Sequence, residues 1–214
     1  MFIEPNNSGE KRGSIEVICG SMFSGKTEEL IRRLKRVRIA NLRVAAFKPA
    51  IDTRYATEKI VSHDTNVVDS FAVSKANEIL LHYNNADVVG IDEAQFFDPE
   101  IADICDVLAF KGVRVIVAGL DMDFKGNPFG PMPALMATAE YVTKVHAVCT
   151  RTGNLANYSF RKNDNDKLVM LGETEEYEPL SRAAYFNAIR QNMIVKDPEN
   201  LSDDPNASEL AKQK

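Results

Sequence analysis

The sequence predicts an α/β fold in which helices flank a mostly parallel sheet. Short apolar runs of strand length alternate along the chain with longer segments of helical periodicity, which is the order of elements in sheets with crossover helices. A glycine-rich motif stands between the first apolar run and the first helical pattern, and a later apolar run ends in two carboxylates. The runs that we interpret as strands are 14–19, 43–48, 88–92, 113–119 and 144–149.

The first strand and the first helix have clear local signals. Residues 14–19 read Ser-Ile-Glu-Val-Ile-Cys, a short run that suits a β-strand. Residues 27–40 bring their apolar side chains to one helical face, at Leu30, Ile31, Leu34 and Val37. Basic residues interleave with that face, and we interpret them as a solvated surface rather than a nucleic-acid site. They are Arg32, Arg33, Lys35, Arg36 and Arg38.

Residues 20–27 match the G-x-x-x-x-G-K-[ST] form of a phosphate-binding loop. Gly20 and Gly25 allow backbone conformations that a side chain would obstruct, so that N–H groups can turn toward a triphosphate at a helix N-terminus. Lys26 is predicted to contact the β- and γ-phosphates, and the Thr27 hydroxyl to bind Mg²⁺. The residues predicted to contact the nucleotide are Gly20, Ser21, Met22, Phe23, Ser24, Gly25, Lys26 and Thr27.

Two carboxylates, Asp92 and Glu93, stand together where the apolar run at 88–92 ends. This is the expected form of the acidic motif that partners a phosphate loop. Asp92 is the candidate for holding Mg²⁺ through its water shell, because this ion is commonly bound by one or two carboxylates with phosphates and waters. Glu93 is the candidate general base, which orients water in a hydrolase or takes the proton of an acceptor hydroxyl in a kinase.

A third motif, Asp52-Thr53-Arg54-Tyr55, follows the strand predicted at 43–48. It therefore falls at the carboxyl edge of the sheet, where open α/β sheets place their sites. Arg54 is a candidate for stabilising charge on a transferring phosphoryl group, and Asp52 for a role near the metal. A surface ion pair within a loop is the alternative for these two residues.

The chain of 214 residues, 44% of them hydrophobic, is long enough for one sizeable domain with a small appendage. We expect a nucleotide-binding core at 13–148 and a small subdomain at 149–192, because the pattern becomes polar and irregular over residues 151–179. Residues 1–12 and 196–214 are polar and are predicted to be disordered.

Composition argues against several classes of protein. No run approaches the ~18 apolar residues that a membrane span needs, and the N-terminus lacks a secretory pattern, so we expect a cytoplasmic protein with no membrane partner. Three widely spaced cysteines argue against a disulfide framework and for a reducing compartment. The formal charge is −5, and five acidic and two basic residues fall within 197–214, so the body is near neutral and no nucleic-acid partner is expected.

Four motifs in register carry a resemblance to a known family. They are the phosphate loop at 20–27, Asp-Thr-Arg-Tyr at 52–55, Ile-Asp-Glu-Ala-Gln-Phe-Phe at 91–97 and Pro-Phe-Gly at 128–130. In this order and at these separations they closely resemble the type II thymidine kinases, cytosolic deoxynucleoside kinases with a RecA-like core. The resemblance implies transfer of the γ-phosphoryl group of ATP to the 5′-hydroxyl of thymidine, giving dTMP and ADP for deoxynucleotide salvage.

The resemblance also implies roles at matching positions. Glu93 matches the catalytic base, Lys26 steadies the phosphates, and Arg54 stabilises them in the transition state. The cofactor-binding set extends from the phosphate loop to Asp92, Glu93, Ala94 and Gln95, and Thr27 and Asp92 hold Mg²⁺. A homotetramer and feedback inhibition by dTTP are further family expectations.

For the nucleoside, the resemblance implies an apolar, aromatic pocket under a loop called the lasso, which matches residues 169–177. The lasso closes over thymine and binds it largely through backbone hydrogen bonds, and Ser159 matches a position near the thymine methyl group. The residues implied to bind the substrate are Met22, Asp52, Phe96, Leu120, Phe124, Phe129, Ser159, Met170, Gly172 and Tyr177. Without the resemblance, core packing is the alternative for the aromatic members.

The chain departs from the family at one place. Family members typically anchor the lasso with a structural zinc held by two Cys-x-x-Cys pairs, and the matching positions here are Cys149, Thr152, Ser181 and Ala184. One thiolate of four is left, and a structural zinc site needs four good ligands. We therefore predict a chain without stoichiometric zinc, in which packing and bound ligand order the lasso instead.

Two other classes of function remain open on sequence grounds. A regulatory or DNA-associated ATPase with a RecA-like core would use Asp92 and Glu93 to activate water, and a nucleotide-binding scaffold would have no turnover. DNA-stimulated hydrolysis without dTMP formation would identify the first, and an unchanged function after Glu93→Ala would identify the second. We prefer a thymidine kinase, because Lys26, Thr27, Arg54, Asp92 and Glu93 are all present.

Overall fold

A computed structural model describes residues 13–50, 59–61, 67–162 and 176–196 of the chain. Its centre is a six-stranded sheet in which every neighbouring pair of strands is parallel. This confirms the predicted α/β class. Across the sheet the order is β5 (Phe71–Val73), β2 (Val44–Pro49), β6 (Val88–Ile91), β7 (Arg114–Leu120), β1 (Ser14–Gly20) and β8 (Tyr141–Lys144).

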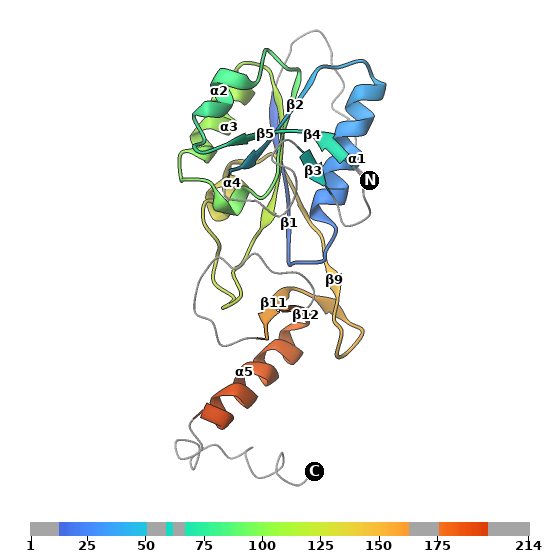
Figure 1. The fold of residues 1–214 in the computed structure, drawn as a ribbon, viewed down its shortest axis with the longest axis vertical. Helices are drawn as coiled ribbons and strands as arrows, with labels where there is room; N and C mark the ends of the chain where they lie inside the picture. Colours follow the sequence, from blue (N-terminus) through green and yellow to red (C-terminus); the bar gives the residue numbers. More distant parts are fainter. Residues whose placement is uncertain (1–12, 51–58, 62–66, 163–175, 197–214) are drawn as a thin grey trace.

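Helices cover both faces of the sheet (Figure 1). The helix α1 (Lys26–Ile39) packs its apolar stripe on one face, against Ile18, Ala46 and Ile116 among others. The opposite face carries α2 (Glu78–His82), α3 (Ile101–Phe110) and α4 (Met132–Thr138), which close a larger apolar cluster. Because both faces are covered, the central strands are apolar nearly throughout, as parallel strands usually are. No helix among the described residues is long and apolar enough to cross a membrane.

The last predicted strand, 144–149, is wrong in its position. The edge strand β8 ends at Lys144 and pairs in parallel with β1, whereas Ala147–Val148 forms a separate strand, β9, antiparallel to β10 (Leu155–Ala156). Residues 141–149 mix apolar and polar side chains and contain no glycine or proline, so the pattern alone does not divide them. The division comes from tertiary pairing, because Val145 N–H still donates to Cys19 O and the chain leaves the sheet after it.

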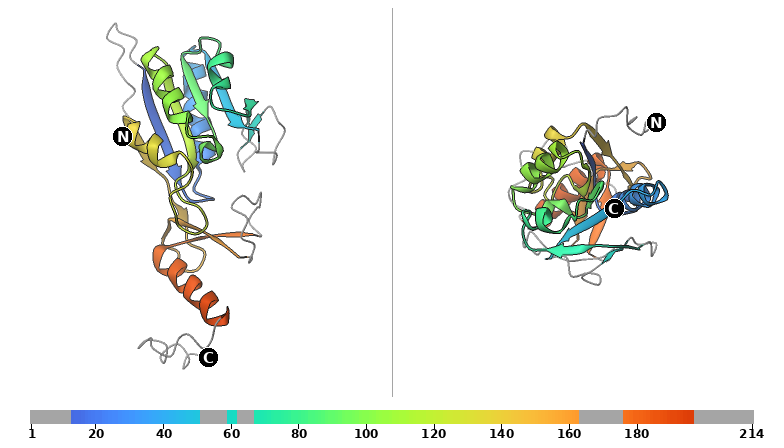
Figure 2. Two further views of the ribbon diagram at one scale, coloured as in Figure 1. Left: turned by 90° about the vertical axis from the view of Figure 1, so that its left-hand side faces the viewer. Right: turned by 90° about the horizontal axis from the view of Figure 1, so that it is seen from above.

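A small lobe follows the sheet. It contains β9, β10, the antiparallel pair β11 (Tyr158–Arg161) and β12 (Tyr177–Leu180), and the helix α5 (Arg182–Lys196). These elements share an apolar cluster of their own, centred on Tyr158, Leu180 and Tyr185. The views in Figure 2 show this lobe beyond one end of the sheet, with α5 pointing away from it. A separate hairpin joins β3 (Lys59–Val61) to β4 (Val67–Asp69).

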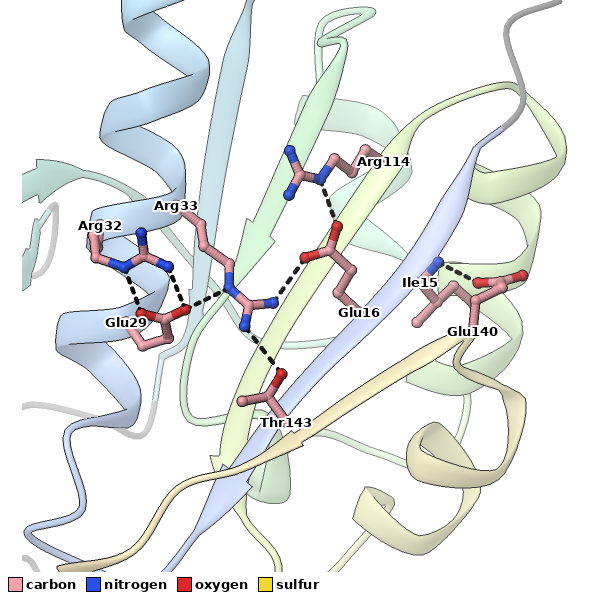
Figure 3. A network of polar contacts seen from close by, with 8 residues as sticks. All are labelled: Ile15, Glu16, Glu29, Arg32, Arg33, Arg114, Glu140 and Thr143. Atoms are coloured by element: carbon pink, nitrogen blue, oxygen red, sulfur yellow. Dashed lines mark hydrogen bonds and ion pairs between the residues drawn. The ribbon is translucent and has the colours of Figure 1, made fainter. Parts of the chain in front are cut away.

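Arg33 corrects the interpretation of the basic residues on the first helix as a solvated face. Its side chain is buried and lies between the helix and the sheet, where it contacts Glu16, Glu29 and Thr143 (Figure 3). The remaining basic positions of the cluster are exposed. The helical spacing had placed Arg33 beside Leu30 and Leu34, and a buried carboxylate on β1 explains why a cation is tolerated there.

Candidate active site

Two of the predicted motifs, the phosphate loop and the Asp92-Glu93 pair, meet at the carboxyl edge of the sheet. The phosphate loop follows β1, Asp92 and Glu93 follow β6, and Leu120 ends β7, and these three strands are neighbours in the order β6-β7-β1. Parallel strands end at the same edge, which is where open α/β sheets build their sites. In Figure 1 the small lobe lies against this edge.

The phosphate loop ends directly at the N-terminus of α1. Gly25 is the N-cap residue with φ of 81°, a left-handed conformation that favours glycine. Lys26 Nζ donates to Ser21 O at 2.7 Å, and Ser24 Oγ donates to the same oxygen at 2.7 Å, so the lysine folds back over the loop. Unpaired N–H groups at a helix N-terminus together with this amine form a site suited to anionic phosphates.

Thr27 lies in the first turn of α1 and Asp92 directly follows β6, and the two side chains are in contact. The Thr27 hydroxyl lies 3.2 Å from Asp92 Oδ2 and 3.3 Å from Oδ1. Burial raises the pKa of the Asp92 carboxyl to about 7, and the neighbouring charge of Glu93 acts in the same direction. Hydrogen bonds from Glu93 N–H and Thr27, and the charge of Lys26, oppose that rise. A hydroxyl beside a carboxylate at the phosphate loop fits the oxygen ligands that Mg²⁺ prefers.

Glu93 occupies a left-handed backbone conformation, with φ of 51° and ψ of 41°. Such conformations are rare for residues other than glycine and cluster at functional sites. The Glu93 carboxylate accepts a hydrogen bond from Gln95 Nε2 at 2.5 Å. Desolvation lowers the pKa of Lys26, while the charges of Glu93 and Asp92 raise it, so the three groups share one electrostatic environment.

The predicted nucleoside residues fall into two contacting groups. Phe96 and Phe129 pack edge to face with ring centroids 5.6 Å apart. Phe124 lies under the Arg161 guanidinium at 3.7 Å, and Arg161 Nε donates to the Tyr177 hydroxyl at 3.1 Å. Leu120 ends β7 beside these groups.

Met22 and Ser159 form a direct link between the phosphate loop and the small lobe. Met22 N–H donates to Ser159 Oγ at 2.9 Å, and Ser21 Oγ donates to Ala156 O at 3.4 Å. A residue predicted for the donor half of the site therefore touches one predicted for the nucleoside half.

The sequence interpretation did not include Arg161. Its side chain is buried, stacks on Phe124, and lies opposite Tyr177 in the β11–β12 ladder. A signal was present, because side chains two residues apart on a strand share a face and Arg161 is two residues beyond Ser159. Four predicted site residues lie outside the described residues: Asp52, Arg54, Met170 and Gly172.

The four positions that match the family's zinc ligands lie together in the small lobe. Ser181 Oγ lies 3.5 Å from Thr152 Oγ1 and accepts from Ala184 N–H at 3.4 Å. Burial alone would raise the pKa of the Cys149 thiol, but hydrogen bonds from the Thr152 hydroxyl and from the backbone and side chain of Ser181 outweigh it and lower that pKa to about 6. One thiol, two hydroxyls and a methyl group do not fit a structural zinc ion, which needs four ligands.

Sequence similarity to known proteins identifies the family of this chain. The sequence profile described as "Thymidine kinase" matches residues 13–185. A thymidine kinase of Bacteroides thetaiotaomicron is 62% identical over 178 residues, which are 83% of this chain and 89% of that protein. One from Porphyromonas gingivalis is 58% identical over 86% of this chain and 90% of its own length, and one from a Rhodothermus species is 56% identical over 83% of both. This chain belongs to the thymidine kinase family.

Proposed function

We propose that this protein is an ATP-dependent thymidine kinase, which transfers the γ-phosphoryl group of ATP to the 5′-hydroxyl of thymidine. The observation that carries the proposal is the pairing of Thr27 with Asp92 at 3.2 Å, which joins the phosphate loop to the acidic motif in a member of this family. Glu93 is the next residue after Asp92, so a candidate base lies beside the phosphate-binding residues.

In this proposal each group has a separate task. Lys26 and the backbone N–H groups of the phosphate loop bind and orient the phosphates of ATP. Thr27 and Asp92 would hold Mg²⁺, which would supply charge neutralisation at the phosphates. Glu93 takes the proton of the thymidine 5′-hydroxyl as that oxygen attacks phosphorus. Arg54 is assigned to the transferring phosphoryl group by the resemblance alone.

The acceptor side of the site is proposed from the small lobe and the end of β7. In this proposal Phe96, Phe124 and Phe129 supply apolar surface for a pyrimidine. The hydrogen bond from Met22 N–H to Ser159 Oγ, which joins the phosphate loop to the small lobe, supports an acceptor site beside the donor loop. Positioning is the larger part of catalysis in phosphoryl transfer, because little covalent chemistry is left to the protein. The direct hydrogen bonds between the phosphate loop and the small lobe suit that requirement.

The experiment that tests the proposal is a transfer assay with γ-labelled ATP, with and without thymidine and with single-stranded DNA as a competing stimulant. We expect label in dTMP only when thymidine is present, and no stimulation of ATP hydrolysis by DNA. Hydrolysis that DNA stimulates and that yields no dTMP would favour the alternative, a DNA-associated ATPase. Binding of ATP with no turnover under either condition would favour a nucleotide-binding scaffold.

Assembly and regulation are proposed on the family resemblance. We expect a homotetramer and inhibition by dTTP, the distant product of the reaction. The edge strand β8 has exposed apolar side chains at Tyr141 and Val142, which suits an edge that another subunit covers. Light scattering would measure the mass of the assembly, and the transfer assay repeated with dTTP would measure the inhibition.

A further inference from the structure

Gln95 lies in the 3₁₀ turn η1 (Ala94–Phe96) and is buried, with 3% of its surface exposed. Its side-chain amide makes two hydrogen bonds: Oε1 accepts from Leu120 N–H at 2.9 Å, and Nε2 donates to Glu93 Oε2 at 2.5 Å. A backbone N–H can only donate, so the amide oxygen must face Leu120 and the amide nitrogen must face Glu93. The end of β7 therefore fixes which way the Gln95 amide points.

Two glycines pack closely against Gln95, one against its side chain and one against its backbone. A Cβ atom on Gly119 would lie 2.9 Å from Gln95 Oε1 and 2.6 Å from Met132 Sδ. One on Gly130 would lie 2.3 Å from the Gln95 carbonyl oxygen, and Gly130 has φ of 49°. Real Cβ atoms do not approach other atoms so closely. The backbone at Gly119 and the backbone at Gly130 are therefore both packed against Gln95. This close packing explains why the Pro128-Phe129-Gly130 motif has a glycine at position 130.

The Glu93 carboxylate needs such a support. It follows Asp92 directly in the chain, and the mutual repulsion of two carboxylates favours side-chain conformations that separate them. The backbone of Glu93 is in the left-handed region, which persists only when surrounding contacts hold it. A neutral donor whose own orientation is fixed by β7 holds the carboxylate without adding charge at the site.

We propose that Gln95 is a positioning residue for Glu93 and that it acts through the amide hydrogen bond rather than by contact with the nucleotide. This inference rests on the proposed role of Glu93 as the general base. It replaces the expectation that the Gln95 side chain binds the cofactor, since both of its polar atoms are engaged within the protein. The end of β7 orients the Gln95 amide, and the amide in turn holds the Glu93 carboxylate in place.

Two substitutions distinguish the hydrogen bond that Gln95 accepts from Leu120 N–H from the one that it donates to Glu93. Gln95→Met keeps the length and removes both hydrogen bonds, whereas Gln95→Glu keeps an acceptor for Leu120 N–H and loses the donor to Glu93. We expect both to lower kcat by about tenfold or more, since misplacing a reacting group by ~1 Å costs up to about 100-fold. The KM values for ATP and thymidine should stay within about twofold, because the interaction matters in the transition state. A Gln95→Glu enzyme with the kcat of the wild type would overturn the proposal.

A double-mutant cycle provides the sharper test. If Gln95 acts through Glu93, then Gln95→Met should produce no further loss of kcat in a Glu93→Ala enzyme, whereas independent effects would multiply. The matched control is Ile101→Val, a buried substitution in α3. Its effect on kcat should be the same factor in the wild type and in the Glu93→Ala enzyme, because the two residues are not coupled. Multiplicative losses for Gln95→Met would show a structural role only and would contradict the proposal.

A crystal structure of Gln95→Met supplies a measurement that does not depend on turnover. The Glu93 carboxylate should leave its wild-type rotamer or become disordered while β7 stays in place. An unchanged Glu93 side chain would contradict the inference even if the enzyme were inactive. If the wild type forms no dTMP, the proposed function fails, and the crystal structure still decides whether Gln95 holds Glu93.

Discussion

Arg33 Nη1 donates to Glu16 Oε2 at 2.8 Å, which joins the first helix to the first strand through an ion pair that is almost completely buried. Glu16 also accepts from Arg114 Nε at 2.6 Å, and Arg33 reaches Glu29 and Thr143 (Figure 3). The Glu16 carboxylate on β1 therefore contacts α1 and β7 directly, and Arg33 extends the network to Thr143 on β8. These are the elements whose ends carry the phosphate loop and Leu120.

Glu16→Ala should destabilise the fold strongly. The substitution leaves the Arg33 guanidinium buried without its central partner, and removing one member of a buried ion pair costs about 3–5 kcal/mol. Urea denaturation of the purified protein measures this loss. Arg43→Ala is the control, because the Arg43–Asp87 pair is solvent-exposed on the arginine side and surface pairs contribute little. Equal effects of the two changes would show that the buried network is not special.

Glu93→Ala should lower kcat for dTMP formation by about 100-fold to 10,000-fold, the range that a general base supplies. ATP affinity should change little, because Lys26 and the loop backbone bind the phosphates. Steady-state kinetics and equilibrium binding of an ATP analogue measure the two quantities separately. A turnover rate equal to that of the wild type would exclude Glu93 as the base.

The purified protein should contain much less than one zinc ion per chain. Three of the four matching positions, Thr152, Ser181 and Ala184, lack a thiol, and their hydroxyl and amide groups bond to one another instead. Elemental analysis checks this directly. A variant with Cys at all three positions should bind about one zinc ion per chain, because these three thiolates and Cys149 together provide four ligands. One equivalent of zinc in the wild type would refute the prediction.

Stability should rise with pH between about 6 and about 8.5 through Cys149. Its folded-state pKa, about 6, lies below the value of about 8.5 for an unfolded thiol, so the stabilisation is full above the unfolded pKa and is lost as the pH falls through the folded one. Arg151 faces the thiol and is itself paired with Glu178. The difference in unfolding free energy between wild type and Cys149→Ser should therefore grow with pH over this window.

The matched control for that titration is Cys105→Ser. Burial raises the pKa of Cys105 to about 12, so this thiol stays protonated in both states below about pH 8. The difference between wild type and Cys105→Ser should accordingly be flat from pH 6 to pH 8. A flat curve for Cys149→Ser as well would show that the Cys149 thiolate does not contribute.

Local sequence patterns were enough to predict the α/β class, four of the five expected strands, the first helix, and the motifs of the phosphate loop and of Asp92 and Glu93. These features are local. A strand shows as an apolar run, a helix as a spacing, and a phosphate loop as glycines at set positions, so each can be recognised within about ten residues.

The contacts between distant groups, in contrast, depend on how the strands and helices pack. Several features depend on residues that are distant in the chain or on the direction of a side chain. They are the end of β8 at Lys144, the burial of Arg33 against Glu16, the stacking of Arg161 on Phe124, and the position of the Gln95 amide between Leu120 and Glu93. The hydrophobic pattern of a sequence predicts only whether a side chain is buried. Which polar partner compensates its burial is settled by the packing of strands and helices against one another.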